Sequence, residues 1–325
     1  MIIDIHAHIV DRTYIGSLLA DGGLESVAGG PGQTLLRKHG HTQAWYREAM
    51  FDIEDRLRQM DRQGIDMRVL SLSAPNVYEW KGARQIAVTR QINDATARMC
   101  AAHPDRFAGL ASLPLDDVEA SLAEIDRARD AGFVGVMIGS NAAGKPMNHP
   151  DFEPLWAKLD ALRFAVIEHP MFPVSTVDME EFELPLRVGF VFDTTLAATR
   201  MIYGGGFERY PNFPYVLAHT GGALLMVLER LDNGYRLFPD CRKYISKMPS
   251  EYAKGLYYDT CSFSGPAIKL AIETVGADRL LWGSDDPFIG ADTKHVDQIG
   301  LPEAQRTAIL GGNAAKILGL EGRRR

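Results

Sequence analysis

Two histidines separated by a single residue, His6 and His8, follow an apolar start at the amino terminus. Strand-forming residues surround them, and successive side chains of a strand point to opposite faces, so the two imidazoles share one face. Two imidazoles on one strand can supply half of the ligands of a divalent metal ion. The alternative is that both are ordinary polar residues at a strand end, so the hypothesis depends on matching ligands elsewhere in the chain.

Matching groups occur at the ends of other short apolar runs. His169 ends the run 164–169, His219 ends the run 215–219, and Asp285 follows the run 280–283. The chain has only 9 histidines, so the placement of His6, His8, His169 and His219 at such ends exceeds what scattered placement would give. Three imidazoles and one carboxylate predict a site for one divalent metal ion, zinc first, with manganese or iron as alternatives.

The runs that carry these groups alternate with helical stretches along the whole chain. The strand-like runs cover 1–8, 67–73, 107–113, 134–139, 164–169, 215–219, 256–259 and 280–283. The helical stretches cover 42–63, 85–103, 118–131, 152–162, 192–203, 223–236, 266–275 and 303–318. This alternation predicts a (β/α)8 TIM barrel that forms one domain over residues 1–325, with a doubly wound open sheet as the alternative.

Two segments have no place in that alternation. Residues 11–40 are rich in glycine and read as irregular, and residues 171–184 follow the fifth strand without a helical pattern. Long loops in compact domains are usually functional. We therefore expect both to be βα-loop insertions over the mouth of the barrel, the face at which a TIM barrel places its active site.

Composition excludes several classes of protein. The net charge of −7 argues against a nucleic-acid partner, for which a basic patch is expected. Cys100, Cys241 and Cys261 are odd in number and widely spaced, so no disulfide framework is predicted. No membrane span and no signal peptide are indicated, and a cytoplasmic location is expected. The arginines at 323–325 are expected to form a solvated tail.

The same residues lie in motifs that resemble a known family. These motifs are His-Ala-His at 6–8, the lone His169, Ala-His-Thr-Gly-Gly at 218–222 and Trp-Gly-Ser-Asp-Asp-Pro-Phe at 282–288. They resemble the metal-dependent amidohydrolase superfamily, most closely the branch typified by aminocarboxymuconate semialdehyde decarboxylase. The resemblance extends through residues 63–66, 103–107, 206–211 and 311–314.

The resemblance implies a ligand set and an acid–base group. His6, His8, His169 and Asp285 are the expected ligands, with Asp285 also part of the catalytic machinery. His219 is expected to orient or deprotonate a metal-bound water and then deliver the proton. Binuclear members carry a bridging carboxylated lysine at the end of the fourth strand, but residues 136–139 contain no lysine and Lys145 lies in the following loop. We therefore expect one metal ion.

Substrate contacts are also implied. An arginine at the position of Arg230 is expected to reach into the site of a neighbouring subunit, which makes a homodimer functional, and Phe288 is expected to line the pocket. Arg47 is a further candidate partner for a substrate carboxylate, and Met171 is a candidate pocket residue. The alternatives are surface ion pairs for both arginines and core packing for Met171. The branch has a tryptophan where this chain has Leu-Pro-Leu at 184–186, which argues against an identical substrate.

Three functions follow in order of preference. The first is a metal-dependent, non-oxidative decarboxylase of a small aromatic or muconate-type carboxylic acid. The second is a hydrolase or hydratase of the same superfamily acting on a ring-cleavage product or lactone, because the metal site alone does not separate the two reactions. The third is a catalytically silent barrel that serves as a binding module, which the complete ligand set disfavours.

Overall fold

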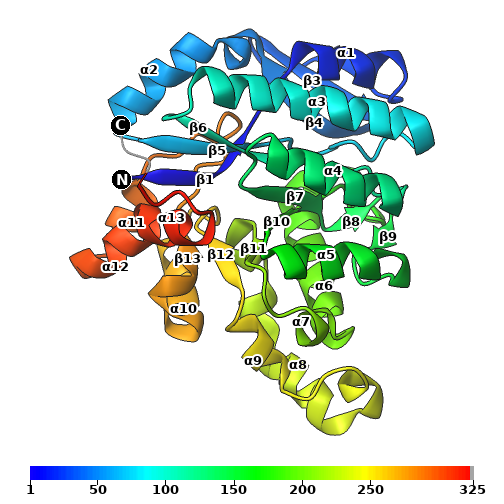
Figure 1. The fold of residues 1–325 in the computed structure, drawn as a ribbon, viewed down its shortest axis with the longest axis vertical. Coiled ribbons are helices and arrows are strands. Elements are labelled where there is room, and N and C mark those ends of the chain that lie inside the picture. Colours follow the sequence, from blue (N-terminus) through cyan, green and yellow to red (C-terminus); the bar gives the residue numbers. More distant parts are fainter. Residues whose placement is uncertain (323–325) are drawn as a thin grey trace.

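The computed structural model describes residues 1–322, and eight of its strands form one sheet in which neighbouring strands run parallel. In sheet order they are β1 Ile3–His8, β5 Met67–Ser71, β6 Phe107–Ala111, β7 Gly135–Gly139, β10 Ala165–His169, β11 Tyr215–Leu217, β12 Tyr257–Asp259 and β13 Leu280–Leu281. The sheet closes, because the Ile5 N–H donates to the Trp282 carbonyl at 3.1 Å and the Asp285 N–H to the His6 carbonyl at 2.8 Å. The (β/α)8 barrel is confirmed and the open sheet is wrong (Figure 1). The predicted tail at 323–325 lies outside the described residues.

Helices form most of the connections between successive strands of the barrel (Figure 1). They are α2 Ile53–Gln63, α3 Gly82–Ala102, α4 Val118–Asp130, α5 Glu153–Leu162, α6 Phe190–Tyr203, α8 Leu224–Leu237 and α10 Gly265–Val275. The predicted closing helix is three consecutive pieces, α12 Glu303–Thr307, η7 Ala308–Gly312 and α13 Asn313–Ile317. Capping fixes their limits: the Asp52 carboxylate accepts from the Asp55 N–H at the start of α2, and Gly64 ends that helix with a φ of 69°.

Burial explains why the strands read as near-continuous apolar runs. Every residue of β1, β5, β6, β7 and β10 is buried, since one face looks into the barrel and the other is covered by helices. A polar side chain on such a strand needs a partner or a function. The histidines at the carboxyl ends of β1 and β10 are therefore exceptions that point to the site.

The first insertion is more ordered than its sequence suggests. It contains α1 Arg12–Ala20 and a three-stranded antiparallel sheet of β2 Glu25–Ala28, β3 Gln33–Lys38 and β4 His41–Arg47. The expected irregular segment to residue 40 is therefore wrong, and the expected helix 42–63 begins only at Ile53. The apolar pattern did not reveal β3 and β4 because a two-residue hairpin turn joins them. In this turn His39 and Gly40 have φ values of 51° and 82° between the paired residues Lys38 and His41.

The second insertion follows β10. It has no strand or long helix over residues 170–183 and then enters the helical segment η3, Pro185–Gly189, which leads directly into α6. The Thr42 hydroxyl of β4 donates to the Glu183 carboxylate at 3.0 Å, so the two insertions touch. No helix within residues 1–322 is long and apolar enough to cross a membrane. A cytoplasmic location stays a prediction.

Candidate metal and acid–base site

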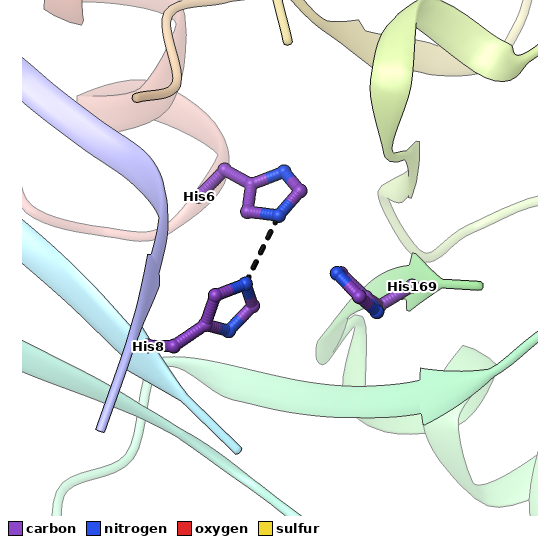
Figure 2. A group of neighbouring side chains, drawn as sticks. All are labelled: His6, His8 and His169. Carbon is purple, nitrogen blue, oxygen red and sulfur yellow. Dashed lines mark hydrogen bonds between the residues drawn. The ribbon is translucent and has the colours of Figure 1, made fainter. Parts of the chain in front are cut away.

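Three histidines from two strands bring their rings together at the carboxyl ends of β1 and β10 (Figure 2). His6 and His8 share one face of β1, and their Nε2 atoms are 3.1 Å apart. The ring centroid of His169 lies 5.1 Å from that of His6 and 5.0 Å from that of His8. Asp285 follows β13, and its Oδ1 lies 3.7 Å from the His6 Nε2 and 3.4 Å from the His8 Nε2.

Each of these three rings has its other nitrogen held by the protein. The partners of the Nδ1 atoms are the Asp259 carboxylate for His6 at 2.6 Å, the Ser71 hydroxyl for His8 at 3.1 Å and the Pro170 carbonyl for His169 at 2.9 Å. A carboxylate and a carbonyl only accept hydrogen bonds, and the Ser71 hydroxyl donates its own proton to the Ala7 carbonyl. Each Nδ1 therefore carries a hydrogen, and each Nε2 is the ring nitrogen that remains available to a metal ion.

The Nε2 atoms of these histidines are placed as the ligands of a metal cation would be. The Nε2 atoms of His6 and His8 lie within hydrogen-bond distance at 3.1 Å (Figure 2), so either one of them carries a proton or the two share a cation. Histidines that bind metals through one nitrogen usually donate the other N–H to a carboxylate or carbonyl, as His6 and His169 do here. Ligands at about 2.0–2.2 Å from one ion lie about 3–4 Å apart, which matches the separations among His6, His8 and Asp285.

Electrostatics prepares most of this set for a metal. Burial, and next the charge of neighbouring imidazoles, lowers the pKa of His169, and burial likewise lowers that of His8. Burial works against the charge of Asp285, but hydrogen bonds from His219 and His8 and the charge of His6 hold its pKa well below the usual range. Two neutral imidazoles and an ionised carboxylate are the protonation states that bind metals.

His6 is the exception, because it has the strongest acidic partners. Burial opposes its imidazolium, yet the hydrogen bond to Asp259 and the charges of Asp285, Asp259 and Asp4 raise its pKa to about 9. A positive charge is thus favoured at the His6 Nε2. A bound divalent ion would supply that charge in place of the proton, so the residues present fit the metal that the sequence predicts.

His219 differs from the three other histidines. It begins the short segment η4, His219–Gly221, with a φ of 52°, a conformation uncommon for any residue but glycine. Its Nε2 lies 3.9 Å from the Asp285 Oδ2, and its buried Nδ1 has no hydrogen-bond partner within residues 1–322. Its side chain is 18% exposed, against 1–2% for His6 and His8, so it combines access to solvent with proximity to the Asp285 carboxylate.

The end of β7 carries no lysine that could bridge two metal ions, as a lysine does in binuclear members of the superfamily. Residues 136–139 are Val-Met-Ile-Gly, and the Lys145 Nζ pairs with the Asp151 carboxylate at 2.8 Å on the surface. The donor atoms of two overlapping groups, one of His6, His8 and His169 and one of His6, His219 and Asp285, each lie within 4.8 Å of one another. The two groups share His6.

A cavity of about 510 Å³ opens over this centre. Aromatic side chains supply much of its wall, and the His8 and Phe288 ring centroids lie 5.5 Å apart. The lining includes His169, His219, Asp285, Gln43, Trp45, Arg187, Phe190, Cys261, Ser262, Phe263 and Phe288. Such a volume and such a mixture of apolar walls with a few polar groups suit a small ring-containing ligand.

The four expected substrate residues have different positions. Phe288 lines the cavity, whereas Met171 is only 3% exposed and packs in the core outside its wall. Arg47, exposed at the end of β4, lies over the Trp45 ring and lines a neighbouring cavity together with Arg56. Arg230 is exposed on α8, away from the cavity of its own chain. The structure thus brings Phe288 to the metal site and does not bring the other three.

Asp259 is a functional residue that the sequence reasoning missed. It ends β12, is fully buried, and binds the Nδ1 of His6 while accepting from the backbone N–H groups of Thr220 and Cys261. Those bonds tie His6 to the segment that follows His219. The rule that found His169 and His219, a polar residue at the carboxyl end of a predicted strand, applies equally to Asp259 at the end of the predicted run 256–259.

A buried network of charges supports the loop that carries Asp285. Asp286 pairs with Arg56 at 2.5 Å and with Arg68 at 3.1 Å, and Arg68 also contacts Asp4 at 3.3 Å. The Ser284 hydroxyl donates to Asp4 at 2.5 Å. These contacts occupy the Asp286 carboxylate, so Asp286 steadies the loop.

Known proteins resemble this chain over nearly its whole length. It is 29% identical to a 2-amino-3-carboxymuconate-6-semialdehyde decarboxylase of Dictyostelium discoideum, with 98% of this chain and 92% of that protein covered. It is 31% identical to a gamma-resorcylate decarboxylase of a Rhizobium strain, with 84% of this chain and 89% of that protein covered. These names agree with the expected carboxy-lyase activity.

Solved structures agree with these relatives. A 5-carboxyvanillate decarboxylase from Sphingomonas paucimobilis superposes with a TM-score of 0.85 at 26% identity, covering 98% of each chain. A dihydroxybenzoic acid decarboxylase from Polaromonas, with bound manganese and the inhibitor 2-nitroresorcinol, gives 0.83 at 26% identity, covering 98% of this chain and 97% of that one. Because residues 3–320 match the family described as Amidohydrolase, the expected superfamily is confirmed, and the chain belongs to the amidohydrolase family.

Proposed function

We propose that this protein is a non-oxidative decarboxylase of a small aromatic or muconate-type carboxylic acid and that it works with one divalent metal ion. The observation that carries the proposal is the contrast among its histidines. Three have Nδ1 fixed by the protein and ligand atoms within 4.8 Å of one another, whereas His219 stands beside them with Nδ1 unpartnered. A metal site and a separate proton-transfer group are what this reaction requires.

His6, His8, His169 and Asp285 would hold the ion, which when bound supplies a Lewis acid for a substrate carboxylate oxygen. His219 delivers a proton to the ring carbon that bears the carboxylate, because an imidazole can donate a proton as a general acid. The bond from that carbon to the carboxylate then breaks, its electron pair restores the ring, and CO2 leaves. Phe288, Phe190 and Trp45 hold the ring and exclude water around the reacting carbon.

Zinc is the metal we propose, because three imidazoles and one carboxylate form a nitrogen-rich set that zinc prefers. The manganese in the Polaromonas relative makes manganese the first alternative. Metal analysis of protein purified without added metal, followed by reloading of the chelated protein with each ion, decides between them. Recovery of turnover with manganese alone would overturn the zinc assignment.

A homodimer is the assembly we propose. The exposed apolar side chains of Val188, Phe192 and Leu196 recur at intervals of four residues along η3 and α6 and form what we name the α6 stripe. Met226 and Arg230 share the same spacing on α8, and Met226 is 74% exposed. A second copy covering this apolar surface would bring its own Arg230 toward a neighbouring site.

The deciding experiment is CO2 release, followed by mass spectrometry, from a panel of hydroxybenzoates and aminocarboxymuconate semialdehyde. The protein is loaded with zinc or manganese, and a chelated sample serves as the control. CO2 that depends on the metal is the expected result. Absence of CO2 from every acid, together with metal-dependent opening of a lactone, would replace the decarboxylase with the hydrolase alternative.

A further inference from the structure

Arg187 is an unpaired cation in the wall of the metal-site cavity. Among the residues that line this cavity it is the single lysine or arginine. Its guanidinium is exposed and makes no hydrogen bond or ion pair with any side chain in the part of the chain that the structure describes. Arginines elsewhere on this surface are commonly paired, as Arg84 is with Asp21 and Arg209 with Glu153.

The backbone that carries Arg187 is held in place. The Arg187 N–H donates to the Glu183 carbonyl at 3.1 Å, and the Glu183 carboxylate accepts from Thr42 of β4 at 3.0 Å. Gly189, two residues on, packs so closely that a Cβ there would lie 2.8 Å from the Pro173 ring. Leu186 and Phe190, on either side of Arg187, line the same cavity. Arg187 is therefore presented to the cavity from a packed segment.

The charges in the cavity leave Arg187 without a counter-ion. Asp285 is the only carboxylate in the lining, and its charge is used by the imidazoles and the ion that they would hold. A ligand that fills the cavity removes water from the guanidinium, which is costly unless the ligand supplies a partner. An acidic group is the natural partner, because a guanidinium matches a carboxylate with two parallel hydrogen bonds.

The carboxylate that is lost as CO2 cannot fill this role if it lies between the metal and His219. We propose that Arg187 binds a second acidic group of the substrate, so that the enzyme selects aromatic dicarboxylic acids over monocarboxylic acids. This inference rests on the proposed function for the place of the first carboxylate. It assigns the choice of substrate to a residue of the second insertion in the same chain, separate from the implied role of Arg230.

Equilibrium binding tests the proposal without turnover. Isothermal titration of the metal-loaded protein with isophthalate and with benzoate, two ring acids that differ by one carboxylate, is compared for the wild type, Arg187→Leu and Arg187→Lys. The wild type should bind isophthalate more tightly. Arg187→Leu should weaken the binding of isophthalate by about tenfold to a hundredfold, the scale of a lost hydrogen bond between charged groups. The affinity for benzoate should change by less than about twofold.

The lysine variant and a matched control sharpen the result. Arg187→Lys keeps the charge but loses the planar fork, so an intermediate affinity for isophthalate is expected. Arg90→Leu removes an exposed arginine from the outer helix α3 and should bind both acids as the wild type does. Circular dichroism melting curves of all variants should coincide, because the Arg187 side chain has no partner to lose.

Two results would overturn the proposal. Equal affinity of the wild type for the two acids would show that no second acidic group is recognised. If Arg187→Leu lost affinity for both acids equally, Arg187 would instead bind the single reacting carboxylate. CO2 release from the same preparations is measured separately, so preferential isophthalate binding without CO2 supports the role of Arg187 while rejecting the decarboxylase.

Discussion

The partner of each Nδ1 atom divides the histidines of the site into two kinds. His6, His8 and His169 have their ring orientation and tautomer fixed by the protein, whereas His219 has only its Nε2 near a charged group. A fixed tautomer suits a ligand, because the lone pair must stay on one nitrogen. An unconstrained ring suits a group that takes up and releases a proton.

The first prediction concerns His219. His219→Asn should lower kcat by about 10²–10⁴-fold, the usual contribution of a general acid or base, because the amide cannot transfer the proton. The metal content, measured by inductively coupled plasma mass spectrometry, should equal that of the wild type. A variant purified without metal would contradict the assignment and make His219 a ligand.

The second prediction concerns Asp259, whose carboxylate fixes the ring of His6. Asp259→Asn keeps the shape of the side chain but removes the charge, and metal affinity should fall by about 10–100-fold. Competition with a chromogenic chelator measures this change. Asp105→Asn, an exposed carboxylate before β6, is the matched control and should bind metal as the wild type does. Unchanged affinity in Asp259→Asn would show that the His6 orientation depends on packing alone.

At the scale of elements, the sequence predicts those parts of the site that depend on the alternation of side chains along a strand and on the parallel pairing of strands. A strand displays alternate side chains on one face, and the carboxyl ends of parallel strands meet at one rim. The sequence alone therefore suffices to group His6, His8, His169 and Asp285. The same argument could not find Arg187, since its position depends on how the segment between β10 and α6 folds back over the cavity. The hairpin at His39 and Gly40 was missed because its signal is a left-handed turn rather than an apolar period.

Asp193 anchors the start of α6 and hence the segment that carries Arg187. Its carboxylate accepts from the Ser140 hydroxyl and from the Asn141 side-chain amide, the latter at 2.8 Å, at the carboxyl end of β7. Burial disfavours the charged form more strongly than these two hydrogen bonds favour it, so the pKa of Asp193 is raised in the folded protein. The anchor should therefore be most stabilising when the carboxyl is protonated.

The third prediction is the pH dependence that follows. An acid whose folded-state pKa is raised stabilises the fold fully below its unfolded pKa of about 3.9, and that stability is lost as the pH rises through the folded pKa. Asp193→Asn is neutral throughout, so its free energy of unfolding relative to wild type should increase as the pH rises above about 4 through the folded-state pKa of Asp193. Urea unfolding at several pH values measures this, with Asp105→Asn as control. Parallel curves would show that the Asp193 pKa is not raised.

At the scale of the whole molecule, the α6 stripe gives the fourth prediction. A charge buried without a partner destabilises an interface, so Phe192→Asp should convert a dimer into a monomer. Size-exclusion chromatography with light scattering measures the mass. Leu19→Asp, which places the same charge on an exposed apolar position of α1, should leave the mass unchanged. A Phe192→Asp protein of wild-type mass would mean that another face forms the assembly.

The fifth prediction separates an arginine that serves its own subunit from one that serves the partner. Arg230→Ala and His219→Asn should each be inactive, the first because every site lacks the arginine of its neighbour. If the two proteins are unfolded together and refolded as a mixture, each mixed dimer contains one site with an intact His219 and a partner that supplies Arg230. Half of the dimers are mixed and one of their two sites is complete, so about a quarter of wild-type activity should return. A mixture that stays inactive would mean that Arg230 acts in its own subunit. If activity returns but is lost again when Phe192→Asp is added to both chains, the shared site depends on the interface at the α6 stripe.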